Sequence, residues 1–244
     1  MGRKPSKRVI LTRSREDIER DRALFEKLGF EVIELPLIKT EPLDYEVREE
    51  DISYIVFQST KAVKYFLRRS GIPEDAKVVA VGEKTKKELE SLGCKVWLVP
   101  EDMSAEGILK EFPEGKGEKV LIPRSEQGRD ELIEGLSKKG YKVLPLNVYR
   151  TVRLIHPKET LMNLLKGGGF IIFASPSAVQ GFFENLQEST ALALLNNLIV
   201  VSIGKTTKKE LEKFGIIPNI IPEKPLMEEV AGKIHRFWQE NCIG

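Results

Sequence analysis

The residues that could do chemistry in this sequence are hydroxyls, loop glycines and basic side chains, gathered in six short segments. Each segment follows a β-rich run and precedes a helical pattern. The start of a helix offers unpaired N–H groups and a positive dipole end, so such segments suit a ligand rich in carboxylates or phosphates. The candidate binding residues within them are Arg13, Ser59, Thr60, Lys84, Thr85, Arg124, Ser125, Ser175, Ser177, Gly204, Thr206 and Thr207.

The same hydroxyls also have a structural interpretation, because Ser and Thr are preferred helix N-caps in any α/β protein. For one hydroxyl alone that interpretation is favoured, whereas six segments together favour an anion-binding site. The sequence contains no acid pair with obvious catalytic spacing, no metal-ligand spacing and no nucleophile elbow. Neither glycine segment matches a phosphate loop or a dinucleotide fingerprint, which argues against a nucleotide-dependent transferase.

One tyrosine lies outside these segments. Tyr149 belongs to an extended, charged passage, where a phenol could donate a proton to a leaving group. Packing between domains would explain this tyrosine equally well. The two histidines, His156 and His235, are isolated in the sequence, and we expect neither to be catalytic.

The elements that must position these residues are duplicated. Residues 81–93 are VGEKTKKELESLG and residues 203–215 are IGKTTKKELEKFG, aligned without a gap. A β-rich run precedes each copy, so each predicts a strand, a short loop and a helix. Capping-box spacing predicts Thr85 and Thr207 as the N-caps of these helices. Tight turns and left-handed helix ends are predicted at the glycines that open and close the copies, which are Gly82, Gly204, Gly93 and Gly215.

Two further segments are duplicated in the same order. Residues 9–37 align with residues 120–148, and YIVFQSTKAV at 54–63 aligns with FIIFASPSAV at 170–179. The chain is therefore A–B–A′–B′, where A is strand–helix–strand and B is three successive strand–helix pairs. Alternating strands and helices predict parallel sheets covered on both faces. One A with one B supplies about five strands, the size of a flavodoxin-like sheet.

Two pairings of these units satisfy the repeat. A with B and A′ with B′ would form domains in series, whereas A with B′ and B with A′ would form a discontinuous domain and an inserted one. Residues 37–43 and 148–154 are extended, charged and without turn signals, and they follow A and A′ at equivalent places. They suit a two-stranded connector, which favours the second pairing and leaves the first open.

The composition is that of a globular protein. The 244 residues suffice for two domains, and the 31% that are charged nearly cancel to a net charge of +2, which gives no support for a nucleic-acid partner. Cys94 and Cys242 lack the spacing of a metal or redox motif. No apolar run approaches the ~18 residues that span a bilayer, and the basic start lacks the apolar region of a signal peptide. We therefore expect a cytoplasmic protein with two free thiols.

Several phrases of the sequence occur together in a known family. They are the pair FQSTKAV and FASPSAV, the pair VGEKT and IGKTT, the run VLIPRSEQGRDEL and the passage VYRT. In this order they resemble uroporphyrinogen-III synthases, from Val9 to about Phe237. The resemblance implies two flavodoxin-like parallel-sheet α/β domains joined by a two-stranded linker, with the active site in the cleft. It selects the crossed pairing, with domains 1–37 plus 154–244 and 43–148, and connectors 38–42 and 149–153.

The resemblance also implies a reaction. The family consists of cofactor-free lyases that cyclise hydroxymethylbilane, a linear tetrapyrrole with eight carboxylates, to uroporphyrinogen III with inversion of ring D. The family tyrosine that assists loss of the hydroxyl corresponds to Tyr149. The family's S-P-S and I-G-x-T-T turns correspond to the segments at Ser175 and Thr206, whereas Glu83 and Lys84 depart from the usual pair in the companion turn.

The chemistry of such a substrate agrees with the residues. Loss of water leaves an azafulvene that the pyrrole nitrogens stabilise, so the enzyme's task is to position the two ends of the chain. We expect no cofactor, no metal, no nucleic-acid or membrane partner, and a monomer. A two-domain protein that binds a small anion in its cleft without catalysis is the alternative.

Overall fold

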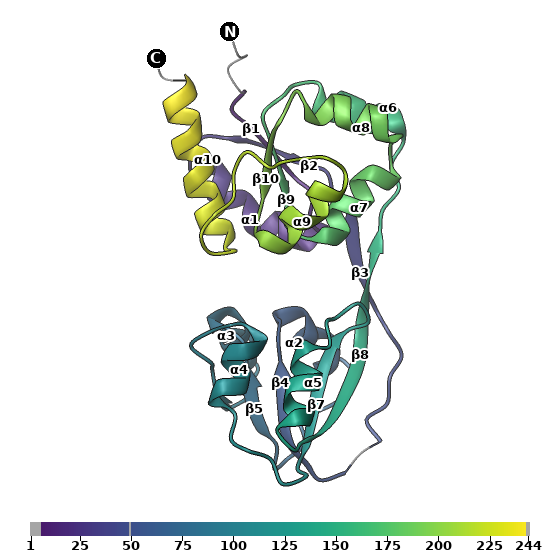
Figure 1. The fold of residues 1–244 in the computed structure, drawn as a ribbon, viewed down its shortest axis with the longest axis vertical. Coiled ribbons are helices and arrows are strands. Elements are labelled where there is room, and N and C mark those ends of the chain that lie inside the picture. The colour runs from purple at the N-terminus through teal and green to yellow at the C-terminus, as the bar shows by residue number, and fades with distance from the viewer. Residues whose placement is uncertain (1–5, 49, 243–244) are drawn as a thin grey trace. The chain divides into compact units, whose positions relative to one another are not determined.

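The computed structural model describes residues 6–48 and 50–242, and the chain divides in it into two compact units (Figure 1). One unit combines the chain up to Lys39 with the chain from Val152 onward, and the other comprises Thr40–Thr151. Each unit contains one A-type and one B-type segment of the repeat. Within the described ranges, no helix combines the length and the apolar character needed to cross a bilayer.

The first unit is built on a parallel sheet with the order β10-β9-β1-β2. Its strands are β1 (Arg8–Leu11), β2 (Glu31–Glu34), β9 (Phe170–Phe173) and β10 (Ile199–Ser202). A bridge between Val201 and Ile220 continues the sheet past β10, which completes the flavodoxin-like order 2-1-3-4-5. Its helices are α1 (Arg15–Glu26), α6 (Lys158–Leu165), α7 (Pro176–Glu184), α8 (Glu188–Leu195), α9 (Lys205–Lys213) and α10 (Met227–Cys242).

The second unit has a sheet with the order β3-β8-β7-β4-β5-β6, in which the strands from β8 to β6 are parallel. Its internal strands are β4 (Ile52–Phe57), β5 (Lys77–Ala80), β6 (Val96–Leu98) and β7 (Lys119–Ser125). Its helices are α2 (Thr60–Leu67), α3 (Glu83–Ser91), α4 (Ala105–Glu111) and α5 (Glu131–Lys138). The predicted class, α/β with flavodoxin-like parallel sheets, is confirmed.

Two strands cross the boundary of the units, β3 (Ile38–Pro42) and β8 (Lys142–Arg153). They are neighbours in the sheet order. At one end the Leu154 N–H donates to the Leu37 carbonyl at 2.9 Å, and at the other the Leu43 N–H donates to the Val148 carbonyl at 3.0 Å. Residue numbers rise along one strand as they fall along the other, so this pair is antiparallel.

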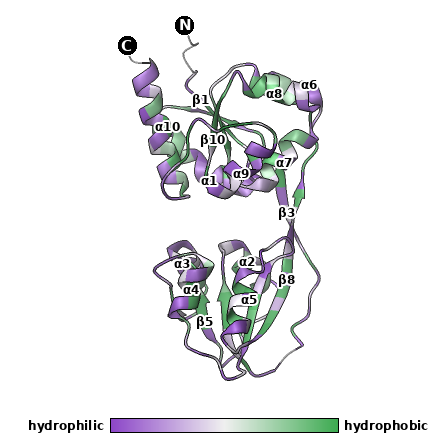
Figure 2. Cartoon of the chain, viewed as in Figure 1, coloured by the Kyte–Doolittle hydropathy of each residue, from purple (hydrophilic) through white to green (hydrophobic). Residues whose placement is uncertain are grey.

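The central strands of each sheet are buried on both faces, which explains why they are largely apolar. In β9, Ile171 and Phe173 pack on one face while Phe170 and Ile172 pack on the other, and all four are fully buried. β4 divides its residues between two core clusters in the same alternating way. Figure 2 shows the strands mainly in the hydrophobic colour and much of the helix surface in the hydrophilic one.

The predicted helix starts are partly right. The hydroxyls of Ser59, Ser104 and Ser175 accept the N–H groups of the residues three positions on, as N-caps do. Thr85 and Thr207 are not N-caps, and that prediction is wrong. Their helices begin two residues earlier, directly after a glycine, so both threonines lie in the first turn and are 3% exposed.

The glycines and the acids of the duplicated segment also have specific roles. Gly82 has φ +83°, whereas Gly204 is extended, so only the first needs the freedom of glycine; Gly93 and Gly215 have the predicted positive φ. Glu210 does not cap its helix. It accepts hydrogen bonds from Lys213 and Gln180, and these hold the pKa of its carboxyl below the ordinary value.

Candidate active site

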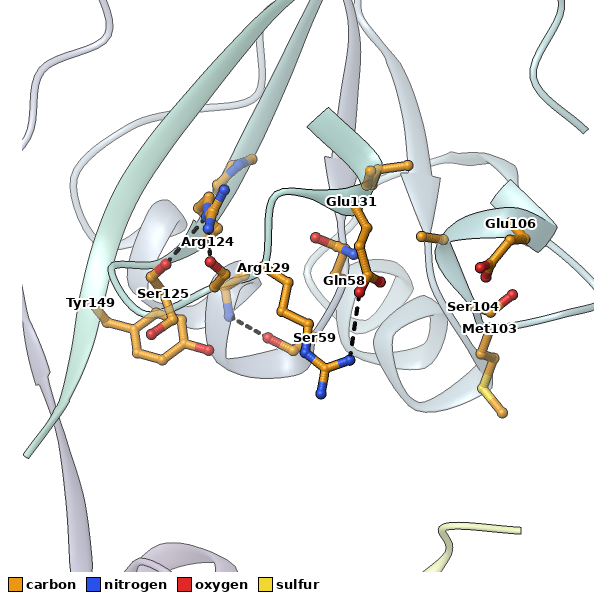
Figure 3. Close-up of a pocket in the computed structure, with 15 residues that line it drawn as sticks. Gln58, Ser59, Met103, Ser104, Glu106, Arg124, Ser125, Arg129, Glu131 and Tyr149 are labelled. Carbon is orange, nitrogen blue, oxygen red and sulfur yellow. Dashed lines mark hydrogen bonds and ion pairs between the residues drawn. The ribbon is translucent and has the colours of Figure 1, made fainter. Parts of the chain in front are cut away.

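A pocket of about 600 Å³ lies in the second unit, at the carboxyl ends of β4 and β7. The chain runs from β4 toward β5 on one side and from β7 toward β8 on the other, so this is the switch point of the sheet. Ligands of open α/β sheets bind at such points. Figure 3 shows the residues that line the pocket, which include Gln58, Ser59, Ser104, Arg124, Ser125, Arg129, Glu131 and Tyr149.

Tyr149 owes its place in the pocket to a bulge in β8. Arg124 pairs with Asn147, but the next residue of β7, Ser125, pairs with Tyr149, so Val148 is extra. Bulges of this kind re-aim a side chain. Val148 enters the core, and Figure 3 shows the Tyr149 phenol directed toward the pocket.

The Tyr149 ring is fixed by a second tyrosine. Its centroid lies 5.1 Å from that of Tyr65, and the two rings are inclined by 18°, which is a stacked arrangement. The Tyr65 hydroxyl donates to Thr40, with the side-chain and carbonyl oxygens at 2.9 and 3.0 Å. The ring of Tyr149 is therefore held on a face that is itself anchored.

The two serines at the helix starts keep a proton to donate. Ser59 accepts the Ala62 N–H at 3.1 Å, and Ser175, in the first unit, accepts the Ala178 N–H at 3.2 Å. A hydroxyl that accepts a capping bond still carries its own O–H, which can point to a ligand oxygen. Capping therefore does not exclude these hydroxyls from binding a carboxylate.

The two arginines at equivalent places in the repeat, Arg13 and Arg124, form ion pairs within their own units. Arg124 is 9% exposed and donates to Asp130 at 2.6 Å, to the Ser125 carbonyl at 3.3 Å and to the Gly128 carbonyl. In the first unit, Arg13 lies 2.5 Å from Asp21 and 3.7 Å from Asp17, and both carboxylates are buried. These bonds give each arginine a local structural role at the end of its strand.

Gln127 ties the loop after β7 to the end of β8. Its side-chain oxygen accepts the Thr151 N–H at 3.0 Å and the Ser125 hydroxyl at 3.0 Å, and its amide nitrogen donates to the Thr151 carbonyl at 3.4 Å. The Glu126 N–H donates to the Tyr149 carbonyl at 2.8 Å. The side chain of Gln127 thus continues the pairing of β7 past the last residue of that strand.

The family model described as uroporphyrinogen-III synthase HemD matches residues 19–231. The chain belongs to the uroporphyrinogen-III synthase family. A putative uroporphyrinogen-III synthase of Methanocaldococcus jannaschii is 30% identical over 88% of this chain and 92% of its own length. The chloroplastic uroporphyrinogen-III synthase of Oryza sativa is 27% identical over 91% of this chain and 77% of its own length.

Solved structures of uroporphyrinogen-III synthases show the same fold. A mutant of the Thermus thermophilus protein superposes with a TM-score of 0.62 at 22% identity, over 96% of this chain and 99% of that one. The Helicobacter pylori protein superposes with a TM-score of 0.66 at 18% identity, over 94% and 99% of the two chains.

Within this member of the uroporphyrinogen-III synthase family, four of the predicted site residues line one pocket: Ser59, Arg124, Ser125 and Tyr149. Thr60, Lys84 and Thr85 belong to the same unit but do not line it, and Thr85 is buried. The other predicted residues follow strands β1, β9 and β10 in the first unit, at the carboxyl end of that sheet. They are Arg13, Ser175, Ser177, Gly204, Thr206 and Thr207.

The sequence interpretation missed Gln127, Arg129 and Glu131, although all three lie in the VLIPRSEQGRDEL run. Arg129 and Glu131 line the pocket, whereas Gln127 does not line it and holds the loop to β8. Their spacing carries no signal, because the bend of the loop after β7 decides where each side chain lies. Among the described residues, no group of three or more His, Cys, Asp or Glu side chains could hold a metal ion. Cys94 is a free thiol, and the Cys242 side chain lies outside the described part of the structure.

Proposed function

We propose that this chain catalyses the cyclisation of hydroxymethylbilane to uroporphyrinogen III, with inversion of ring D and loss of water. The observation that carries the proposal is the family match over residues 19–231, together with a switch-point pocket into which Tyr149 projects. The enzyme would act as a monomer in the cytoplasm and serve tetrapyrrole biosynthesis.

The chemistry required of the protein is limited. The C–O bond of the hydroxymethyl group breaks as the adjacent pyrrole nitrogen supplies its electron pair, and the oxygen leaves as water after taking a proton. The substituted carbon of ring D then attacks the resulting azafulvene to give a spiro intermediate, whose rearrangement inverts ring D. The substrate supplies the reactive electrons, so we expect no cofactor and assign the protein the task of positioning.

Tyr149 is the proposed proton donor to the departing hydroxyl. A phenol held by stacking at the rim of a pocket can deliver a proton along one direction, which is what general-acid catalysis requires. The proton returns when the pyrrole rings regain their aromatic form after ring closure. The net reaction therefore consumes no proton and releases one water.

The carboxylates of the substrate are assigned to the two sets of helix starts. In the second unit the proposed contacts are the hydroxyls of Ser59, Thr60 and Ser125 and the segment of Lys84 and Thr85. In the first unit they are Ser175, Ser177, Gly204, Thr206 and Thr207. Arg124 and Arg13, which the sequence also predicts as contacts, are held in internal ion pairs and position these strand ends. We further propose that the domains are 1–37 plus 154–244 and 43–148, linked by 38–42 and 149–153.

The test is the identity of the product. Purified protein is supplied with hydroxymethylbilane, and the I and III isomers are separated after oxidation to porphyrins. We expect isomer III to dominate, because isomer I is what forms from the substrate without enzyme. A product that contains no excess of isomer III would leave the alternative, a protein that binds a small anion in its pocket without catalysis.

A further inference from the structure

Two arginines line the pocket of the second unit, and the structure distinguishes their roles. Arg124 is buried and has three partners on the loop that follows it: Ser125, Gly128 and Asp130. Arg129 belongs to the same loop, but its side chain is 60% exposed. A buried arginine with satisfied donors costs too much to release for ligand binding, whereas an exposed one does not.

The loop backbone around Arg129 is nevertheless fixed. Arg124 bonds to Gly128 and Asp130, the residues immediately before and after it. A Cβ added at Gly128 would lie 2.7 Å from Arg124 Nε, so the close approach depends on glycine. Arg129 is thus an exposed side chain on an anchored backbone, and the fixed backbone lowers the entropic cost of binding.

Arg129 forms an ion pair with Glu131 at the edge of the pocket. The closest nitrogen and oxygen atoms are 3.9 Å apart, and the two side chains are 60% and 64% exposed (Figure 3). Exposed ion pairs of this length contribute little to stability. The Glu131 carboxylate therefore shows that a carboxylate can approach this guanidinium from the pocket, and its own ion pair is weak.

We propose that Arg129 binds a carboxylate of the tetrapyrrole substrate, and that Glu131 occupies its guanidinium until the substrate arrives. The inference rests on the proposed function, since it names a contact in the same pocket. A guanidinium can grip a carboxylate through two parallel N–H donors, a geometry that the 3.9 Å pair with Glu131 does not reach. Binding replaces the 3.9 Å pair with Glu131 by a charge-assisted contact with the substrate.

The test compares two substitutions whose effects should have opposite signs. Arg129→Gln should raise the KM for hydroxymethylbilane by about tenfold, the loss expected for one charge-assisted hydrogen bond, with kcat changed less than twofold. Glu131→Gln should leave KM equal to or below the wild-type value, because the internal competitor is gone. Arg129→Lys should recover part of the loss, since it keeps the charge but not the paired donors.

Arg48 and Glu46 provide a matched control in the same unit. They form an exposed ion pair at 2.9 Å and do not line the pocket, so Arg48→Gln and Glu46→Gln remove the same charges without touching the site. Thermal unfolding of all variants should agree within a few degrees, because both pairs are exposed.

Two outcomes would overturn the inference. One is a KM for Arg129→Gln equal to that of Arg48→Gln. The other is a rise in KM for Glu131→Gln as large as that for Arg129→Gln, which would indicate a purely structural pair. Failure of the proposed function is separate: it would appear in the wild-type protein as the absence of any excess of isomer III. A wild-type excess of isomer III with an unchanged KM in Arg129→Gln would overturn this inference alone.

Discussion

Tyr149 shows how a single residue is aimed by its neighbours. One extra residue in β8, Val148, turns the strand so that Val148 enters the core and Tyr149 pairs with Ser125 at the pocket. The stack on Tyr65 then fixes the ring plane. A proton donor must point at its acceptor and stay at a fixed distance from it. The bulge directs the Tyr149 side chain, and the stack holds its ring in place.

Removal of the Tyr149 hydroxyl should therefore affect turnover and not folding. Tyr149→Phe keeps the ring and its stack, so we expect the free energy of unfolding to change by less than about 1 kcal/mol. The kcat for formation of uroporphyrinogen III should fall about a hundredfold, the lower end of what general-acid catalysis contributes. Steady-state kinetics and denaturant unfolding of the same preparation check both statements. A wild-type kcat in this variant would remove the phenol from the mechanism.

Tyr141, at the start of the same segment of chain, has the opposite character. It is 6% exposed, and its hydroxyl donates to the Pro113 carbonyl at 2.9 Å. Burial, with the neighbouring Tyr54 as the next cause, raises the pKa of Tyr141 to about 12. The unfolded chain loses this proton near its ordinary pKa of 10.0, while the folded protein keeps it, so its share of stability is lost as the pH rises from 10 to 12.

The prediction at alkaline pH compares the pH dependence of the unfolding free energy in two variants, Tyr141→Phe and Tyr149→Phe. Tyr141→Phe should flatten the decline in unfolding free energy between pH 10 and pH 12, measured by urea denaturation at fixed ionic strength. Absorbance of the phenolate should show one tyrosine fewer among those that titrate late. Tyr149→Phe serves as the comparison, and an identical slope in Tyr141→Phe and the wild type would contradict the assignment.

At the scale of elements, the loop from Ser125 to Asp130 is organised by two side chains. Arg124 holds the far end of the loop through Gly128 and Asp130, and Gln127 joins its near end to Thr151 on β8. The loop also supports the backbone of Tyr149, whose carbonyl accepts the Glu126 N–H at 2.8 Å. Neither side chain needs to touch substrate for this, so both are positioning residues.

Gln127→Ala should loosen the end of β8. We expect the Thr151 amide to exchange with solvent at least tenfold faster, because its hydrogen-bond acceptor is removed. Turnover should fall by about tenfold with a smaller change in KM, as expected for misplacement of a catalytic group. Hydrogen exchange and kinetics measured together separate this role from substrate binding.

Glu126→Ala is the matched variant, because Glu126 contributes its backbone N–H to the Tyr149 carbonyl and that bond survives the substitution. It should leave both exchange and turnover near the wild-type values. Unchanged exchange at Thr151 in Gln127→Ala would show that the side-chain bonds do not support the strand.

The sequence predicts elements better than it predicts contacts. The N-caps at Ser59 and Ser175 follow from local chemistry and are confirmed. The capping box at Thr85 fails because a glycine at the strand end lets the helix begin sooner, which is a property of the turn and not of the box. Helix α8 went unpredicted, since its apolar residues form no clear stripe in the sequence ESTALALL.

The candidate site was only partly predictable for a related reason. A strand end can be located from the repeat, so Ser59 and Ser125 could be named in advance, and Tyr149 could be named from its extended passage and the family resemblance. Which of Arg124 and Arg129 stays exposed depends on the path of a loop, and residue types do not determine that path. The repeat aligned Arg124 with Arg13 and so drew attention to the two arginines that have buried or internal partners.

At the scale of the whole molecule, each unit contains one A-type and one B-type segment, but in different chain orders. In the first unit the sheet order corresponds to 2-1-3-4-5, and in the second the parallel strands follow 3-2-1-4-5 in their own chain order. The second is a circular permutation of the first. Both orders place the A-type strand beside the first B-type strand, β1 with β9 and β7 with β4.

This arrangement makes the second unit a continuous piece of chain that should fold by itself. Residues 40–151 carry both core clusters of that unit, on the two faces of β4. We expect the isolated fragment to unfold cooperatively in urea, because a single domain of this size can bury enough surface to be stable. Circular dichroism and the sharpness of its unfolding transition are the measurements.

A shorter fragment tests why the A-type segment is needed. Residues 51–118 retain β4, β5 and β6 but lose β7 and β8, so β4 changes from a central strand to an edge. Ile55 and Val56, fully buried in the complete unit, would lose the cover of the missing elements. This fragment should show no cooperative transition. Cooperative unfolding of the short fragment, or its absence in residues 40–151, would contradict the view that one A and one B together form the folding unit.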